Sequence, residues 1–219
     1  MNESFMVQPR GTATAAARWA GIALVVLVLV TLPNGGGQAP ERKHEESGGS
    51  RNHIVEAARG QVGVTVSYDP SYVALTYPGG DVPRERGVCT DVVIRALREG
   101  RGMDLQKLVH EDMKAHFSKY PGIWGLKRTD RNIDHRRVPN LRTYFKRKGF
   151  SLPVTRTAGD YKPGDFVTCT VPPNRPHIMI VSSRNTPGGV PLVIHNIGRG
   201  AREEDALFTY PITGHYRLQ

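Results

Sequence analysis

Between residues 51 and 150 the apolar residues recur three and four positions apart, the spacing that places them on one face of an α-helix. The spacing is clearest from Cys89 to Gly100, where the helix follows Gly87 and ends on a glycine suited to a C-terminal cap. Three further helices each open on a residue type that favours a helix start, namely Asn52, Asp104 and Pro139. The predicted ranges are 52–62, 89–100, 105–119 and 139–149.

After residue 152 the pattern changes to short runs of β-branched and aromatic residues separated by turns that contain Pro, Gly and Asn. These runs predict strands at 166–171, 177–182, 190–195, 208–210 and 212–217. Helices followed by a series of short strands are typical of an α+β fold with an antiparallel sheet. Residues 120–137 show neither the helical spacing nor the strand-like runs. Loops of this length are usually functional or disordered, and the polar and aromatic side chains of this one suit the wall of a cleft.

The N-terminal part of the chain has a different character. Arg10 and Arg18 precede an apolar run from Trp19 to Leu32, which is shorter than the about 20 residues that span a bilayer and resembles the apolar region of a signal peptide. Including Ala13–Ala17 gives a spanning length. Residues 1–32 are therefore predicted to be a cleaved export signal or a retained membrane anchor. Either one places the remaining chain outside the cytoplasm, in the periplasm or an equivalent compartment.

Residues 33–50 combine glycines with a run of charged side chains, and nothing in them could bury an apolar face. We predict that they form a disordered linker and that residues 51–219 form the folded domain. The whole chain carries 30 Lys and Arg against 20 Asp and Glu, a formal charge of +10, which favours polyanions such as nucleic acid, anionic lipid or an acidic cell-wall polymer. No nucleic-acid-binding motif accompanies the charge, so nucleic acid is not an expected partner.

The two cysteines are too few for a disulfide framework. Cys89 is predicted at the first turn of a helix. Unpaired backbone amides and the helix dipole favour an anion there, and a thiol in that place ionises more easily than a free one. Cys89 is therefore a candidate nucleophile, and a buried structural cysteine is the alternative. Cys169 lies within a predicted strand and is assigned to core packing, with a disulfide to Cys89 as the alternative. No metal-binding motif occurs, and no metal or cofactor is expected.

A nucleophilic cysteine needs a base within hydrogen-bond reach, and the base needs a group that orients it. His177 opens a predicted strand directly after a proline-rich loop, and the next strand ends in His195-Asn196. Adjacent antiparallel strands would bring His195 or Asn196 close to His177. We expect a set of Cys89, His177 and either His195 or Asn196, with His195 as the named candidate, to attack an amide carbonyl, with the amide of Cys89 binding the oxyanion.

This order of motifs resembles that of the NlpC-type papain-like cell-wall peptidases. Tyr77-Pro-Gly79-Gly80 resembles the Tyr and Gly-Gly that precede their catalytic cysteine, and His177-Ile-Met-Ile-Val resembles their His-Val-Gly-Ile strand. Val193-Ile194-His195 resembles the strand with their third polar residue. The resemblance implies a papain-like α+β fold and hydrolysis of a peptidoglycan amide bond. It departs at Val88 and Thr90, where the NlpC-type motif has Asp and Ser.

Nearly the whole span from Ala57 to Arg217 also resembles a bacterial family known only as domain of unknown function 1287. The matching runs are Tyr77-Pro-Gly-Gly-Asp-Val-Pro, Gly87-Val-Cys-Thr-Asp-Val-Val-Ile-Arg-Ala, Leu108-Val-His-Glu-Asp-Met, Asn132-Ile-Asp-His-Arg-Arg-Val-Pro-Asn-Leu, Pro163-Gly-Asp, His195-Asn-Ile-Gly and Gly214-His-Tyr-Arg. This resemblance covers more of the chain, but it implies a function only through the NlpC-type enzymes.

Six further residues are candidate substrate contacts because they adjoin these motifs or occur in the long loop. They are Tyr77, Asp91, Asn196, Asp134, His135 and Arg136. Asp91 could instead complement the helix dipole, and residues 134–136 could form a surface ion-pair cluster.

We therefore predict an exported cysteine amidase or peptidase whose partner is peptidoglycan or another cell-wall peptide, with membrane attachment through residues 1–32 as an option. The alternative is a catalytically inactive wall-binding module on the same fold. The motifs do not specify which bond is cut.

Overall fold

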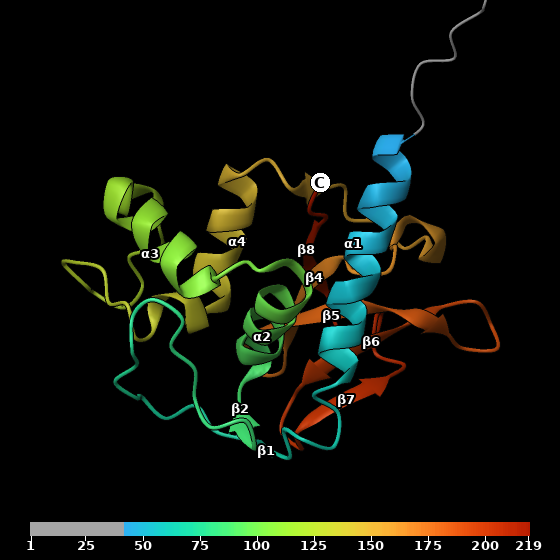
Figure 1. Ribbon diagram of the computed structural model, residues 1–219, viewed down its shortest axis with the longest axis horizontal. Coiled ribbons are helices and arrows are strands. Elements are labelled where there is room, and N and C mark those ends of the chain that lie inside the picture. Colours follow the sequence, from blue (N-terminus) through green and yellow to red (C-terminus); the bar gives the residue numbers. More distant parts are fainter. Residues whose placement is uncertain (1–41) are drawn as a thin grey trace, which may run out of the picture. The chain divides into compact units, whose positions relative to one another are not determined.

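The computed structural model describes residues 42–219 (Figure 1). The predicted signal or anchor at 1–32 and the first half of the predicted linker at 33–50 lie outside this range. Within it, no helix is both long and apolar enough to cross a membrane.

The described chain forms four α-helices, three short 3₁₀ helices and eight strands. The helices are α1 (Arg42–Arg59), α2 (Cys89–Arg101), α3 (Leu105–Ala115), α4 (Val138–Arg147), η1 (Phe117–Lys119), η2 (Asp134–Arg136) and η3 (Ala158–Asp160). The strands are β1 (Ser67–Tyr68), β2 (Arg86–Gly87), β3 (Ser151–Leu152), β4 (Phe166–Val171), β5 (Arg175–Asn185), β6 (Pro191–Asn196), β7 (Ala201–Glu204) and β8 (Ile212–Tyr216).

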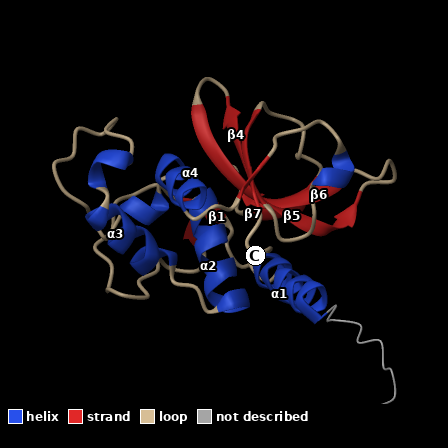
Figure 2. Ribbon diagram, turned by 90° about the horizontal axis from the view of Figure 1, so that it is seen from above, coloured by secondary structure: helices blue, strands red, loops and turns tan. Residues whose placement is uncertain are grey.

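The main sheet has six strands in the order β3-β8-β4-β5-β6-β7, and every neighbouring pair is antiparallel. β1 and β2 form a separate parallel pair directly before the cysteine. Strand β5 is central: α1, α2 and α4 all contact it, and these helices lie on one side of the curved sheet (Figure 2). The α+β architecture with an antiparallel sheet is therefore confirmed.

Alternate residues of β5 build two separate cores, because successive side chains of a strand point to opposite faces. Ile178 and Ile180 belong to the helix-side core, which the helices cover. Met179 and Val181 belong to the loop-side core, which residues such as Tyr161 from the connecting loops cover. Both faces of the central strand are thus buried, and polar groups brought to either face lose their contact with water.

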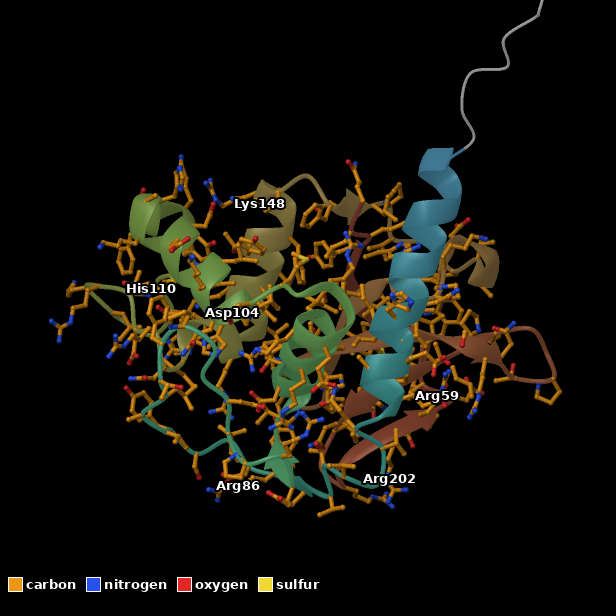
Figure 3. All side chains as sticks on the ribbon, in the orientation of Figure 1. Arg59, Arg86, Asp104, His110, Lys148 and Arg202 are labelled. Carbon is orange, nitrogen blue, oxygen red and sulfur yellow. The ribbon has the colours of Figure 1, made fainter. Side chains whose placement is uncertain are left out.

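Local sequence explains how the helices around the site begin and end. The Asp104 carboxylate accepts a hydrogen bond from the Gln106 amide and caps α3, as its residue type predicted (Figure 3). α2 ends on Gly102 in the left-handed conformation, two residues beyond the predicted cap at Gly100. A side chain on Gly100 would meet the His53 carbonyl oxygen at 2.7 Å, so this glycine lets α1 and α2 pack closely.

The structure also differs from the predicted elements in other places. Asn52 does not cap α1, because that helix begins earlier, at Arg42. Residues 208–210 form a turn and not a strand. Strand β7 was missed because three of its four residues are charged. Charged residues are common on edge strands, where they discourage pairing with another chain.

Candidate active site

Cys89 is the first residue of α2, as predicted, and the chain enters the helix in a fixed geometry. The Val88 amide donates to the Asp91 carboxylate over 2.6 Å, which satisfies one of the unpaired amides at the helix start. A side chain on Gly87 would lie 2.9 Å from the same carboxylate, so glycine is required there. The cysteine is thus held at a defined point between a two-residue strand and the helix.

The segment that leads into the cysteine is held by Arg95, which is 1% exposed. Its guanidinium donates to the Asp81 carboxylate over 2.9 Å and to the carbonyl oxygens of Val82 and Arg86 over 3.0 and 3.1 Å. A planar guanidinium with several donors can fix such a loop at many points. Arg95 therefore connects the middle of α2 to the entry of its own N-terminus.

Asp91 and Arg136, two predicted substrate contacts, form a buried ion pair with each other. Arg136 Nε and Nη2 each donate to the Asp91 carboxylate over 2.9 Å, and both side chains are almost fully buried. The Thr90 hydroxyl also donates to the Arg136 carbonyl oxygen over 3.0 Å. These bonds fasten the end of the long loop to the start of α2, and they leave Asp91 no charge to offer a ligand. A substrate role for either residue stays a prediction.

The environment of Cys89 does not favour its thiolate, which corrects the expectation from its position. The side chain is 4% exposed, and burial raises the pKa of the thiol to about 12. The backbone amides of Ile178 and Thr90 face the sulfur and lower the pKa, as amides at a helix start should. Desolvation is the larger effect. The helix end supplies the expected stabilisation of the anion, but the surrounding core outweighs it.

The predicted imidazole pair is present. His177 Nε2 lies 2.8 Å from His195 Nδ1, so His195 and not Asn196 is the hydrogen-bond partner of His177. His195 Nε2 lies 2.9 Å from a carboxylate oxygen of Glu204 on β7. Burial, together with repulsion from His195, lowers the pKa of His177 to about 3. Burial also lowers the pKa of His195, against the opposing effect of Glu204. Both rings are therefore neutral at pH 7.

Cys89 and His177 lie on chain segments that meet. The Ile178 amide that faces the Cys89 sulfur belongs to the residue directly after His177. In the part of the chain that the structure describes, no hydrogen bond joins the thiol to either imidazole, and no partner occurs for His177 Nδ1. The start of α2 thus adjoins the backbone of β5, without a preformed thiol–imidazole bond. By strand alternation the His177 side chain shares the loop-side face with Met179 and its pairing partner Cys169, whereas Cys89 belongs to the helix-side core.

Asn196 connects the sheet to the segment before the cysteine. Its amide nitrogen donates to the carbonyl oxygens of Ser67 and Gly87 over 3.1 and 2.9 Å, and its oxygen accepts from the Gly198 amide over 3.1 Å. The side chain is fully buried. These bonds fix β6, and so His195, relative to the residues that lead into Cys89. The predicted substrate contact of Asn196 remains untested beside this structural role.

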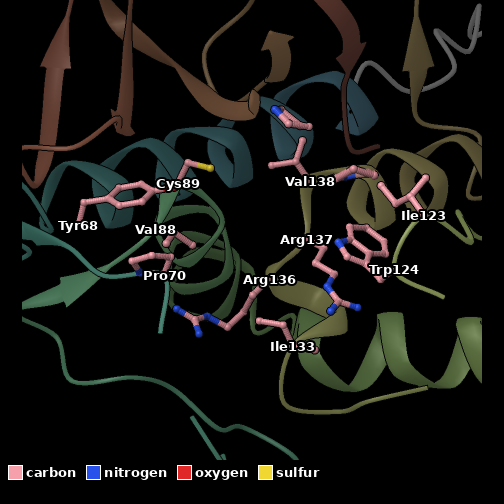
Figure 4. Close-up of a pocket in the computed structure, with 12 residues that line it drawn as sticks. Tyr68, Pro70, Val88, Cys89, Ile123, Trp124, Ile133, Arg136, Arg137 and Val138 are labelled. Carbon is pink, nitrogen blue, oxygen red and sulfur yellow. The ribbon is translucent and has the colours of Figure 1, made fainter. Parts of the chain in front are cut away.

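A cavity of about 290 Å³ adjoins Cys89. Cys89 and Tyr68 lie on one side of it, and Ile123, Trp124 and Arg137 on the other (Figure 4). The complete lining is Tyr68, Pro70, Val88, Cys89, Ile123, Trp124, Ile133, Arg136, Arg137, Val138, Pro139 and Pro176. Most of these side chains are apolar, and several come from residues 120–137, the loop whose composition suggested a cleft wall.

Of the predicted site residues only Cys89 and Arg136 line this cavity; His177, His195 and Asn196 do not, and neither do the other predicted contacts. Tyr77 packs edge-on against His110 at 5.3 Å between ring centres, with Arg131 over its ring. Asp134 is buried within η2, and burial raises its pKa to about 6. His135 is buried beside it, and burial followed by the charge of Arg136 lowers its pKa to about 3. The structure therefore brings Cys89 together with only part of the predicted set.

Three residues that the sequence did not single out belong to the site. Tyr68 lines the cavity, and burial raises its pKa to about 12, with smaller contributions from the acidic groups of Cys89 and Asp91. The Arg137 guanidinium lies 4.2 Å above the Trp124 ring. Glu204 ends the imidazole chain. Tyr68 and Glu204 belong to no motif, and Arg137 lies within a matching run but was not singled out, so only their spatial positions reveal them.

The second cysteine is also buried and free. Cys169 lies opposite His177 in the pairing of β4 and β5 and belongs to the loop-side core, where burial raises the pKa of its thiol to about 11. Both cysteines are unbridged, so the disulfide alternative is wrong for this structure and core packing is the observed role of Cys169. Residues 42–219 contain no group of His, Cys, Asp and Glu side chains arranged to bind a metal.

The fold and the site together define an α+β domain with a buried cysteine at a helix start beside two imidazoles. The chain belongs to the family described as "Domain of unknown function (DUF1287)", whose model matches residues 55–218. It is 57% identical over 164 residues to "Uncharacterized protein YijF" of Escherichia coli strain K12. The aligned residues make up 75% of this chain and 80% of that protein. No solved structure matches the chain significantly.

Proposed function

We propose that this domain is a cysteine hydrolase of the NlpC-like, papain-like type, exported from the cytoplasm, that cleaves an amide bond in peptidoglycan. The observation that carries the proposal is the position of Cys89. It starts a helix, lines a cavity, and has the amide next to His177 facing its sulfur. A thiol, a base and backbone donors are the groups that thiol-dependent acyl transfer requires.

In this mechanism the Cys89 thiol gives its proton to Nδ1 of His177 as the sulfur attacks the amide carbonyl carbon. The backbone amides at the start of α2 stabilise the oxyanion. The protonated His177 then transfers the proton to the leaving amine as the carbon–nitrogen bond breaks, which leaves a thioester on Cys89. Water, deprotonated by His177, hydrolyses the thioester and releases the acid and the free thiol.

Proton transfer during the attack, rather than a resting ion pair, agrees with the electrostatics. Burial raises the pKa of Cys89 to about 12 and lowers that of His177 to about 3, so the resting pair is neutral. A neutral imidazole can accept a proton, but with these pKa values the transfer from the thiol is strongly uphill in the resting structure. Binding of substrate in the cavity would have to turn the His177 ring toward the Cys89 sulfur and bring the two pKa values closer together.

The cavity suits a peptide with an apolar part and an acidic group. Trp124, Ile123 and Val138 offer apolar contact area. Arg137 is the lining cation whose charge is least neutralised, since its ion pair with Asp134 is 3.4 Å long and Arg136 is fully engaged by Asp91. An Arg beside an apolar wall favours a carboxylate of an acidic wall peptide. The net charge of +10 would also attract an acidic polymer.

Digestion of purified peptidoglycan by the full-length protein tests the proposal. The wild-type protein should release new amine termini that mass spectrometry identifies, and Cys89→Ala should release none. Cys169→Ala is the matched control, because it removes the other buried thiol, and it should retain release. Equal release by wild type and Cys89→Ala, or none by any protein that binds the wall, would reject the hydrolase.

The same electrostatics favour a second candidate, a wall-binding module in which Cys89 is inert. A thiol 4% exposed with a pKa of about 12 is a poor nucleophile at rest. In that case Cys89→Ala would sediment with purified wall material as the wild type does, and neither would cleave it. Alkylation by iodoacetamide at pH 7 would also remain slow in the presence of wall peptides, whereas the hydrolase should react faster once substrate-like peptides open the site.

A further inference from the structure

We propose that Glu204 is a positioning residue that fixes the proton arrangement of His195 and, through it, of His177. Glu204 follows no motif and lies on an edge strand, yet its carboxylate is 2.9 Å from His195 Nε2. His195 Nδ1 is in turn 2.8 Å from His177 Nε2. The consequence for catalysis rests on the proposed hydrolase. The proton arrangement itself does not.

The arrangement follows from which atoms can donate. An ionised carboxylate only accepts hydrogen bonds, so the bond to Glu204 requires the proton of His195 on Nε2. A neutral imidazole has one donor and one acceptor, so His195 Nδ1 is then the acceptor. The bond between the rings must therefore be donated by His177 Nε2. His177 Nδ1 is left without a proton, and an unprotonated nitrogen is what a base for the Cys89 thiol needs.

Burial makes this control effective. His195 is 1% exposed and His177 is 4% exposed, so water cannot easily supply alternative hydrogen bonds that would stabilise the other tautomers. The Glu204 side chain is 42% exposed and keeps contact with solvent. Its negative charge, placed at the outer end of the chain, would also stabilise positive charge as it develops on the imidazoles during proton transfer.

The neighbouring acid shows that the contact is specific to Glu204. Glu203 forms ion pairs with Arg59 and Arg184 and accepts a bond from the Ser182 hydroxyl. In residues 42–219 the ion pair of Glu204 is made to His195 and not to an arginine. Successive side chains of β7 point to opposite faces, so only one of these two acids can reach the imidazole pair.

Nitrogen NMR of the histidine rings in the full-length protein tests the arrangement directly, because protonated and unprotonated ring nitrogens resonate far apart. Spectra of His177→Gln and His195→Gln assign the two rings among the eight histidines. In the wild type, both His177 and His195 should carry their proton on Nε2. In Glu204→Ala the two rings should become tautomeric mixtures, whereas Glu203→Ala should leave them unchanged. A His177 proton on Nδ1 in the wild type, or unchanged tautomers in Glu204→Ala, would overturn the inference.

Peptidoglycan digestion then measures the consequence. Glu204→Ala should lower kcat on the order of a hundredfold with little change in KM, since the base and not the substrate site is disturbed. Glu204→Gln should recover part of the rate, because its amide oxygen can still accept from His195. An unchanged kcat in Glu204→Ala, with wild-type digestion intact, would reject the positioning role alone. Absence of digestion in every protein, with the tautomers as expected, would reject the hydrolase and leave the proton arrangement standing.

Discussion

The main sheet contains two contacts between a buried imidazole and a carboxylate, and they differ in what surrounds them. His195 bonds to Glu204 near one edge of the sheet, and His215 on β8 bonds to Asp165 over 2.7 Å on the other side of the central strand. Sequence reasoning gave a role to the first histidine and none to the second. Both histidines are almost fully buried, so burial does not distinguish them.

The second contact is closed on all sides. Asp165 is fully buried and also accepts two bonds of 2.7 Å from Arg217. Burial raises its pKa, but the bonds from Arg217 and His215 are stronger in sum and lower it. The other ring nitrogen of His215 faces the Pro153 carbonyl oxygen, and its ring stacks on Tyr161. Both ring nitrogens of His215 and both carboxylate oxygens of Asp165 are engaged, which is the mark of a structural network.

The first contact continues to a second imidazole, that of His177 on β5. His177 uses Nε2 to reach His195, and its chain neighbour faces the Cys89 sulfur. The comparison teaches that a buried histidine–carboxylate pair holds a fold together when all its atoms are engaged. It can serve chemistry when one ring nitrogen, here Nδ1 of His177, has no partner among the described residues.

Replacing the histidine of each network should separate the two roles most clearly. His177→Gln keeps a donor toward His195 but removes the base, and we expect peptidoglycan digestion to fall about a thousandfold. His215→Gln should keep the wild-type rate per folded molecule. The measurement is the initial rate of terminus release, corrected for the folded fraction. Equal losses in the two variants would show that the comparison has no functional meaning.

Removing the carboxylate should destabilise the protein more in the Asp165 network than in the Glu204 network. Asp165→Ala leaves Arg217 and His215 without their buried partner, and such a loss costs about 3–5 kcal/mol of the free energy of unfolding. Glu204→Ala should cost less than about 1 kcal/mol, because that carboxylate is 42% exposed. Urea denaturation monitored by circular dichroism measures both. A larger loss in Glu204→Ala would contradict the assignment of the closed network as the structural one.

The burial of His177 should make the free energy of unfolding fall as the pH is lowered. Its pKa is about 3 in the folded protein and about 6.5 in an unfolded chain. Between these values the unfolded state binds more protons, so this contribution to stability is complete above pH 6.5 and is lost as the pH falls. The slope is about 1.4 kcal/mol per pH unit.

From pH 6.5 to 5, the wild type should therefore lose about 2 kcal/mol more than His177→Gln. Comparing the two proteins cancels contributions from other groups, including His135, whose pKa burial also lowers to about 3, and Asp134, whose raised pKa acts in the opposite direction. Parallel losses in the two proteins would mean that His177 is not held neutral by burial.

The sequence predicted the parts of the fold that depend on neighbours along the chain. The cysteine at a helix start, the Asp104 cap, strand β4 and the α+β class all follow from local spacing and residue type. The pairing of His177 with His195 was also predictable, because consecutive antiparallel strands with short connections lie side by side. Strand β7 was not predictable, because an edge strand made mostly of charged residues lacks an alternating apolar pattern.

The tertiary structure decided the charge states of these residues and which distant side chains they contact. Chain position alone favoured a thiolate at Cys89, but the core packed around it raises the pKa of the thiol. Asp91 and Arg136 are 45 residues apart and neutralise each other, and Glu204 reaches an imidazole from a strand that the sequence did not predict. Desolvation and ion pairing depend on which distant segments surround a group. The sequence therefore determined which residues could do chemistry, and the packing of those segments determined their charge.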